Sequence, residues 1–132
     1  MHQRTIIWGF INCLIAVVLG AFGAHSLKAI LAQSALNTFE IGVRYQFYHG
    51  LALCIIGLLS FQFPSVNLNI SKTLFLIGIV LFSGSLYLLA CKSLVSLPLQ
   101  IIGPLTPIGG LCFISGWIIL IIKFFKLNTN VK

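Results

Sequence analysis

The sequence predicts an all-α membrane protein, in which four transmembrane helices form a compact bundle with a short amphipathic interfacial helix between spans one and two. Hydrophobic residues make up 59% of the 132 residues and charged residues only 7%, whereas a soluble domain carries about 25% charged residues. The few charges leave uncharged apolar runs of about 20 residues, the length that crosses a bilayer as a helix. The chain suits one domain, residues 1–132.

The first span is predicted over residues 5–25. The run from Thr5 to Ala24 contains no charged residue. Arg4 precedes this run and small residues end it, as in a secretory signal peptide. The run is, however, longer than the apolar core of about 7 to 15 residues that such a peptide has. We therefore expect a retained span.

The interfacial helix is predicted over residues 26–36, because Leu27, Ile30 and Leu31 recur at helical spacing while Lys28 lies off their face. Such a helix would lie along the membrane surface.

The second span is predicted over residues 38–63. Asn37 is expected to cap its first turn, and Glu40 to reach back as in a capping box. Glu40 and Arg44 then stand one turn apart in the favourable order for an ion pair. Pro64 follows the last residue of the span.

The third and fourth spans are predicted over residues 73–91 and 106–124. The uncharged stretch from Ser93 to Ile122 is too long for one span and contains three prolines. We expect Pro104 to lie at the break before the last helix, and Pro107 to lie in the first turn, where its missing N–H costs nothing.

Four spans place both termini on one side of the membrane. The predicted termini side carries more Lys and Arg than the other, and positive residues favour the cytoplasmic side, so both termini are expected in the cytoplasm. The same cations are expected to contact anionic lipid headgroups. Nothing resembles a basic patch for nucleic acid. The termini side has Arg4, Lys72, Lys123, Lys126 and Lys132, and the other side Lys28, Arg44 and Lys92.

Small residues are expected to make the helix contacts, because close backbone approach holds helices together in lipid. In the first span they recur every four residues, beside Gly23. The alternative for Gly23 is that it only ends its helix. The predicted packing residues are Ala16, Gly20, Gly23, Ala24, Gly78, Gly84, Ser85, Gly109, Gly110 and Gly116.

A polar cluster is predicted at one mouth of the bundle, where the first span ends and the second begins. We expect a hydrogen-bond network that locks the helix ends; the alternative is a functional role, such as a proton relay or ligand contact. Two His residues without a third ligand do not predict a metal site. The cluster comprises His25, Glu40, Arg44, Tyr45, Tyr48 and His49.

Four motifs resemble those of the small four-span membrane proteins of domain-of-unknown-function family 423, whose eukaryotic relatives are the transmembrane protein 256 type. They are GAFGAHSL (20–27), FEIGVRYQFYHGLAL (39–53), LFSGSLYLLA (81–90) and GPLTPIGGLCFISGW (103–117). The resemblance covers nearly the whole chain. It implies an all-helical membrane protein, and it implies no activity. We expect the protein to be integral to the bacterial plasma (inner) membrane.

We therefore expect a structural or accessory membrane component that acts through helix packing and through protein or lipid contacts, as a homo-oligomer or in a larger complex. An enzyme or a resident cofactor is not expected, since the single acidic residue, Glu40, excludes paired-carboxylate chemistry. One alternative is an oligomeric small transporter or channel. The other is a membrane protein that binds a cofactor or metal through His25 and His49.

Overall fold

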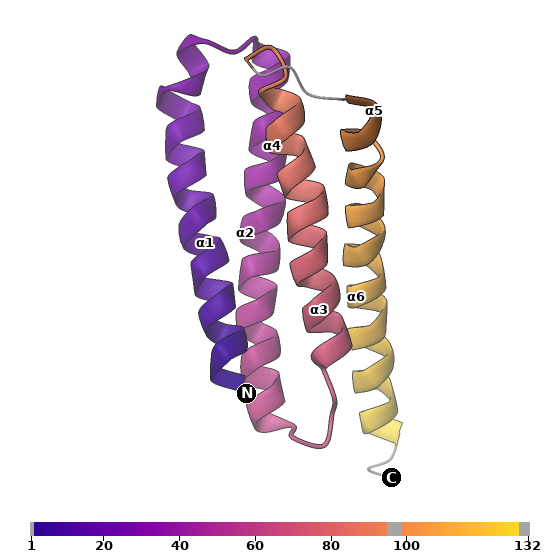
Figure 1. Cartoon of the computed structure of the whole chain (residues 1–132). Helices are drawn as coiled ribbons and strands as arrows, with labels where there is room; N and C mark the ends of the chain where they lie inside the picture. The colour runs from indigo at the N-terminus through magenta and orange to yellow at the C-terminus, as the bar shows by residue number, and fades with distance from the viewer. Residues whose placement is uncertain (1, 95–98, 130–132) are drawn as a thin grey trace.

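The computed structural model of this protein describes residues 2–94 and 99–129, and these residues form helices joined by short turns, without strands (Figure 1). The elements are α1 (His2–His25), the 3-10 turn η1 (Leu27–Ala29), α2 (Gln33–Gln62), α3 (Asn69–Gly78), the π-helical segment η2 (Ile79–Ser83), α4 (Gly84–Ala90), the short α5 (Leu99–Ile102) and α6 (Leu105–Thr129).

The segments α3, η2 and α4 continue one another as a single rod, which we call the α3–α4 rod (Figure 1). The helices α1 and α2, the α3–α4 rod and α6 run in alternating directions along the chain. The first and last described residues consequently lie at one end of the molecule, which we call the termini end.

Three of these helical stretches are long and apolar enough to cross a membrane: Gln3–Ala29, Asn69–Ala90 and Gln100–Leu127. The 30-residue helix α2 does not join this set. Its apolar sequence is interrupted by polar residues such as Gln46 and His49, and both of these side chains are buried inside the protein.

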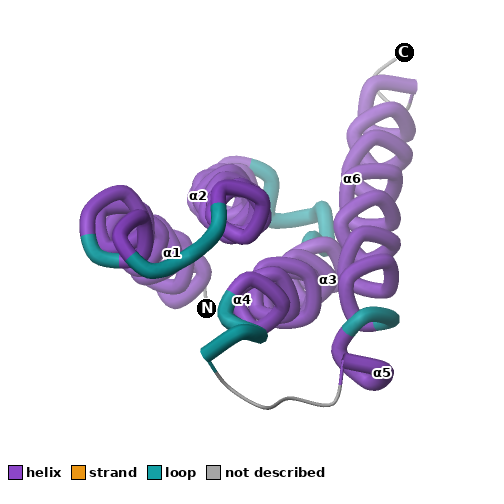
Figure 2. The backbone as a smooth tube through the Cα atoms, turned by 90° about the horizontal axis from the view of Figure 1, so that it is seen from above, coloured by secondary structure: helices purple, strands orange, loops and turns teal. Residues whose placement is uncertain are grey.

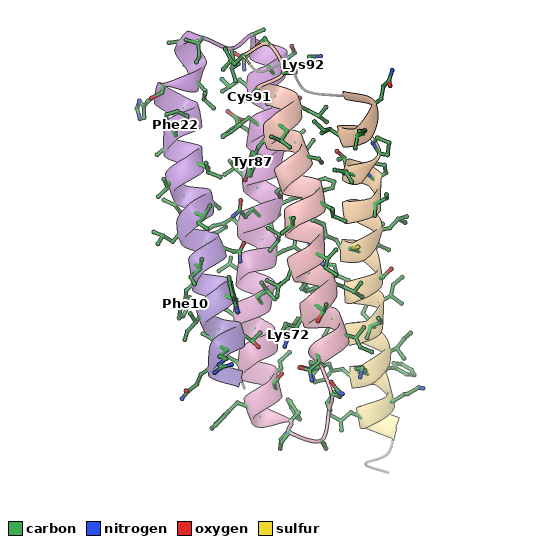
Figure 3. The ribbon with its side chains drawn as sticks, viewed as in Figure 1. Phe10, Phe22, Lys72, Tyr87, Cys91 and Lys92 are labelled. Carbon is green, nitrogen blue, oxygen red and sulfur yellow. The ribbon has the colours of Figure 1, made fainter. Side chains whose placement is uncertain are left out.

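The helices pack in an open row, seen from above in Figure 2. Helix α1 packs on α2, α2 on the α3–α4 rod, and the rod on α6, whereas α1 and α6 stand apart at the two ends. The predicted compact bundle is therefore wrong in one respect, because the outer helices do not close a ring. Phe10 and Phe22 lie on the exposed side of α1, where the helix surface is not covered by another helix (Figure 3).

Residues 26–36 do not form the predicted interfacial helix. They hold the single turn η1, and α2 already begins at Gln33. Leu27 and Leu31 turn inward and pack in one cluster with Phe39 and Ala90. Two of the three apolar side chains that predicted a surface helix thus cover the ends of α1, α2 and α4, and only Ile30 stays exposed.

The start of α2 also differs from the prediction. Ala32 occupies the N-cap position with no side-chain cap. Asn37 lies inside the helix, where its Oδ1 accepts a 2.8 Å hydrogen bond from Gln33 Nε2. The capping box is thus absent, because the helix begins four residues before Asn37. The ion pair between Arg44 and Glu40 is present, with a nitrogen–oxygen distance of 3.1 Å.

The last helix begins near the predicted proline. Pro107 lies in the first turn of α6, and the carbonyl of Pro104 accepts the N–H of Ile108 at 3.4 Å. The stretch between α4 and α6 contains the short α5, and its residues 95–98 lie outside the described residues.

The π-helical segment η2 changes which neighbour the α3–α4 rod faces. A π-helical segment inserts an extra residue and so rotates the helix that follows. Before η2, α3 packs mainly on α6, and after it α4 packs mainly on α2. Because of this rotation, one rod packs against both neighbouring helices. Phe75, before η2, and Leu86, after it, are both buried.

Candidate functional site

The buried polar side chains of α2 lie at the centre of the row and form the candidate site. They fall into two groups on different faces of α2. One group is centred on His49 and faces α6. The other is centred on Gln46 and connects α1 with α4.

His49 is 5% exposed and is held by two hydrogen bonds. Trp117 Nε1–H donates to His49 Nε2 at 3.2 Å. Because an indole nitrogen only donates, Nε2 must accept, and the hydrogen of the neutral ring lies on Nδ1. That nitrogen then donates to the Tyr45 carbonyl at 2.9 Å. Both ring nitrogens of His49 are therefore engaged.

Aromatic rings enclose the same imidazole. The His49 ring stacks on Phe113 with centroids 3.5 Å apart and planes 10° apart. The Phe75 ring stands at 74° to it, with centroids 5.1 Å apart. The Tyr45 ring lies nearly parallel to the imidazole, with the two centroids 6.1 Å apart. These contacts join α2 to α3 and α6 and leave His49 in an aromatic box.

A second polar group runs through three helices. Tyr87 on α4 donates its hydroxyl to Gln46 Oε1 at 2.7 Å, and Gln46 Nε2 lies 3.5 Å from Asn12 Oδ1 on α1. Asn12 Nδ2 donates to the carbonyl of Trp8 at 2.8 Å. We call this the Asn12–Gln46–Tyr87 chain. It bridges α1, α2 and the α3–α4 rod.

A hydroxyl pair links the rod to α6. Ser85 Oγ donates to the Phe82 carbonyl at 2.9 Å and lies 2.6 Å from Thr106 Oγ1. Since the Ser85 proton is used, Thr106 donates in this pair. The hydroxyls of Ser71 and Ser83 are also buried, but neither has a hydrogen-bond partner in the described residues.

The closest crossing of α1 and α2 is made by Gly9 and Gly50. A Cβ placed on Gly9 would lie 2.8 Å from the Gly50 carbonyl oxygen, and one on Gly50 would lie 3.2 Å from the Gly9 oxygen. Cys13 and Cys54 stand four residues further along the two helices, and each thiol reaches a carbonyl of the opposite helix at 3.8 Å. The pattern Gly-x-x-x-Cys thus occurs on both helices and packs reciprocally.

Many of the predicted packing residues make close contacts. A Cβ on Gly23 would lie 3.1 Å from Phe39, and one on Gly20 3.3 Å from Val43. Against α6 the contacts are tighter, because a Cβ on Gly109 would collide with the backbone of Phe82. The pairs Gly78 with Phe113 and Gly116 with Phe75 also approach closely, whereas Gly110 makes only ordinary contact; Ala16 and Ser85 are buried.

Two of the predicted packing residues do not pack. A Cβ on Gly84 would have nothing within 4 Å, and Ala24 is exposed. Both positions therefore face away from neighbouring helices.

The predicted polar cluster is not formed as one site. The contacts of Gly23 with Phe39 and Gly20 with Val43 fix the register of α1 and α2. In that register His25 lies about 12 residues from the level of His49, or roughly 18 Å at 1.5 Å per residue. His25 is exposed at the end of α1, while His49 faces α6.

Of the other predicted members, Tyr45 contacts both His49 and Tyr48, as their shared helix face predicted. Glu40 and Arg44 pair with each other on the surface. Tyr45 joins the aromatic box, and Tyr48 is 57% exposed. The prediction failed because helical spacing gives the face that residues share on one helix, but not which neighbouring helix meets that face.

The partners that matter most were not predicted from the sequence, namely Asn12, Gln46, Tyr87, Thr106 and Trp117. A usable signal was present. Asn12 and Gln46 are amides within or at the edge of uncharged runs, and in lipid such side chains pair across helices. Within the described residues there is no group of three His, Cys, Asp or Glu side chains placed to hold a metal ion.

Comparison with known proteins identifies the family. Residues 19–110 match the model of the family described as "Protein of unknown function (DUF423)". This chain belongs to that family. The family description assigns no function, and no solved structure gives a significant match.

Relatives extend the match over most of the chain. The UPF0382 membrane protein SH2409 of Staphylococcus haemolyticus is 46% identical over 121 residues, covering 92% of this chain and 94% of the relative. The UPF0382 membrane protein YwdK of Bacillus subtilis is 39% identical over 122 residues, covering 92% and 95%. Its relatives are named membrane proteins, and its own helices are long and apolar enough to cross a membrane. This member of the DUF423 family is therefore a membrane protein.

Proposed function

We propose that this DUF423 protein crosses the membrane four times and acts as a structural or accessory component through contacts on its outer surface. The observation that carries the proposal is that the polar side chains at the centre of the row bond to one another across helices. The Asn12–Gln46–Tyr87 chain and the His49–Trp117 bond hold neighbouring helices together. Their hydrogen-bonding groups are engaged within the protein.

The position of α2 supports its role as the fourth span. It lies between α1 and the α3–α4 rod along its length, so it reaches the same depth as the helices on either side. A polar residue in a span is stable when it faces the protein interior. Gln46 and His49 do so, which explains why hydropathy alone does not select α2.

Charge supports an orientation with both termini in the cytoplasm of a plasma (inner) membrane. Arg4, Lys72 and Lys123 lie towards the termini end, where no acidic residue of the described chain lies. The opposite end has Lys28 and Lys92 together with the Glu40–Arg44 pair, in which the carboxylate offsets one cation. The positive-inside rule then favours cytoplasmic termini.

We further propose that the protein self-associates through the outer face of α2. Tyr48 is 57% exposed, and its hydroxyl has no hydrogen bond within the described residues. By the register of α1 and α2, Tyr48 lies near the level of Leu14, about halfway along α1. A hydroxyl without a partner is costly at that depth in lipid. A second copy, with its own Tyr48 at the same height, supplies a partner.

The test is the native mass of the protein in a mild detergent, with Tyr48→Phe as the variant. We expect a homo-oligomer for the native chain and a shift towards monomer for Tyr48→Phe, which removes only the hydroxyl. Phe10→Leu on the exposed side of α1 is the matched control and should keep the oligomer. A native chain that is monomeric throughout, or ion flux in liposomes that Gln46→Leu abolishes, would contradict the proposal and favour a transporter.

A further inference from the structure

A polar pocket opens at the termini end of the molecule, between the start of α1, the end of α2 and the α2–α3 turn. Its volume is about 240 Å³. Apolar side chains of α2 and the turn form part of its wall, and the remaining wall is polar. The polar lining residues are Thr5, Ser60, Asn67, Asn69 and Lys72.

The hydrogen bonds within the α2–α3 turn leave this pocket rich in donors. Asn67 Oδ1 accepts the backbone N–H of Asn69 at 3.0 Å, and Asn69 Oδ1 accepts Lys72 Nζ at 3.3 Å. Both amide oxygens, which would repel an anion, are thus occupied inside the turn. The amide NH₂ groups remain as donors, and an ammonium group has three N–H bonds, of which Lys72 uses one here.

The charge around the pocket is positive. Lys72 lies at the termini end, and Lys92 at the opposite end (Figure 3). Lys123 Nζ donates to the backbone carbonyl of Asn67 and so brings a second cation to the same turn. The single acidic residue of the chain, Glu40, lies on the first half of α2, towards the other end. No carboxylate of the described residues therefore neutralises the pocket.

The depth of the pocket matches that of lipid headgroups. Thr5 begins the uncharged run of α1, and Lys72 immediately precedes the uncharged run of the α3–α4 rod. Both residues thus lie where apolar helix surface gives way to charge, which is the headgroup level of a bilayer.

We propose that this pocket binds a phosphate group, with Lys72 as its principal charged contact. The chemistry is shared by the headgroup of an anionic phospholipid and by free phosphate. Since lysine and neutral N–H and O–H donors bind a phosphate without needing a metal, the residues in place are sufficient. This inference does not depend on the oligomeric state or on which leaflet the pocket faces.

The experiment measures binding of short-chain phosphatidylglycerol, phosphatidylcholine and inorganic phosphate to the purified full chain in a non-ionic detergent. Lys72→Gln removes the proposed contact, and Ser60→Leu fills the pocket without changing charge. Arg4→Gln is the matched control, because it removes the same charge at the same end but outside the pocket lining.

We expect phosphatidylglycerol to bind saturably and more tightly than phosphatidylcholine, with Lys72→Gln weakening it about tenfold or more, as the loss of a charged hydrogen bond implies. Ser60→Leu should also weaken it, and Arg4→Gln should change affinity less than about threefold. If inorganic phosphate alone shows this same dependence on Lys72, the pocket binds phosphate but its source is the free ion.

Equal losses for Lys72→Gln and Arg4→Gln would overturn the proposal, because they would show general surface attraction. Saturable binding of neither phosphate source would overturn it as well. Should Lys72→Gln fail to fold, undiminished phosphatidylglycerol binding by Ser60→Leu would be the contradicting result.

Discussion

At the scale of single residues, two buried serines of the α3–α4 rod stand in contrasting environments. Ser83 is 0% exposed and its hydroxyl has no partner in the described residues, whereas Ser85 is 2% exposed and bonds to Phe82 and Thr106. A buried hydroxyl without a hydrogen bond costs free energy that a paired one recovers. The two serines are two residues apart and therefore form a natural pair of test and control.

We predict that Ser83→Ala leaves the free energy of unfolding unchanged or raises it, because it removes an unpaired hydroxyl. Ser85→Ala should lower it by about 0.5 to 2 kcal/mol, the range of hydrogen bonds between membrane helices. Unfolding by SDS in mixed micelles measures both. Similar losses for the two variants would mean that Ser83 has a partner.

His49 and His25 are predicted to differ in the same measurement. His49→Phe keeps an aromatic ring against Phe113 but leaves the Trp117 N–H without an acceptor, so the free energy of unfolding should fall by about 1 kcal/mol. His25→Phe alters an exposed residue at the end of α1 and should stay within about 0.5 kcal/mol.

A double-mutant cycle checks the assignment. Trp117→Phe should cost less in the His49→Phe background than in the native protein, because the shared hydrogen bond is already lost. Equal costs in the two backgrounds would show that the two residues are not coupled.

At the scale of helices, the Gly9–Gly50 crossing sets how closely α1 and α2 approach. Gly50→Ala places a methyl group 3.1 Å from the Cys13 backbone nitrogen, and we predict a loss of about 1 to 3 kcal/mol from overpacking. Gly84→Ala is the control, since its Cβ meets nothing within 4 Å, and alanine is the better helix former. Thermal unfolding in detergent should show Gly84→Ala as neutral or stabilising; a loss equal to that of Gly50→Ala would contradict the assigned crossing.

The helices themselves could be predicted from the sequence, but their contacts only in part. In lipid, apolar side chains remain exposed, so an apolar pattern does not report which face meets a neighbour. Small residues identified Gly78, Gly109 and Gly116 as contact positions, yet Gly9 and Gly50 were missed. No sequence signal marked the π-helical segment. Its role is to let α3 and α4 face different neighbouring helices, and those neighbours are not apparent in the sequence.

At the scale of the whole molecule, the open row places its polar residues in the middle and its apolar residues outside. His25 and His49 were predicted to share a site because both lie near the expected interface. The earlier start of α2, at Gln33, places His49 further from the helix end than the predicted start at residue 38 did. Which polar residues meet therefore depends on how far each lies from the end of its helix, and not only on which side of the membrane the connecting turn lies.

The central claim is that α2 crosses the membrane with its polar residues turned inward. It is tested most directly by labelling single cysteines in intact cells with a membrane-impermeant maleimide. Ser26→Cys and Ser65→Cys lie in the exposed turns before and after α2, and the native chain gives the background from its four half-buried cysteines. We predict that Ser26→Cys labels in intact cells and Ser65→Cys only after permeabilisation; labelling of both from the same side would contradict a four-span protein.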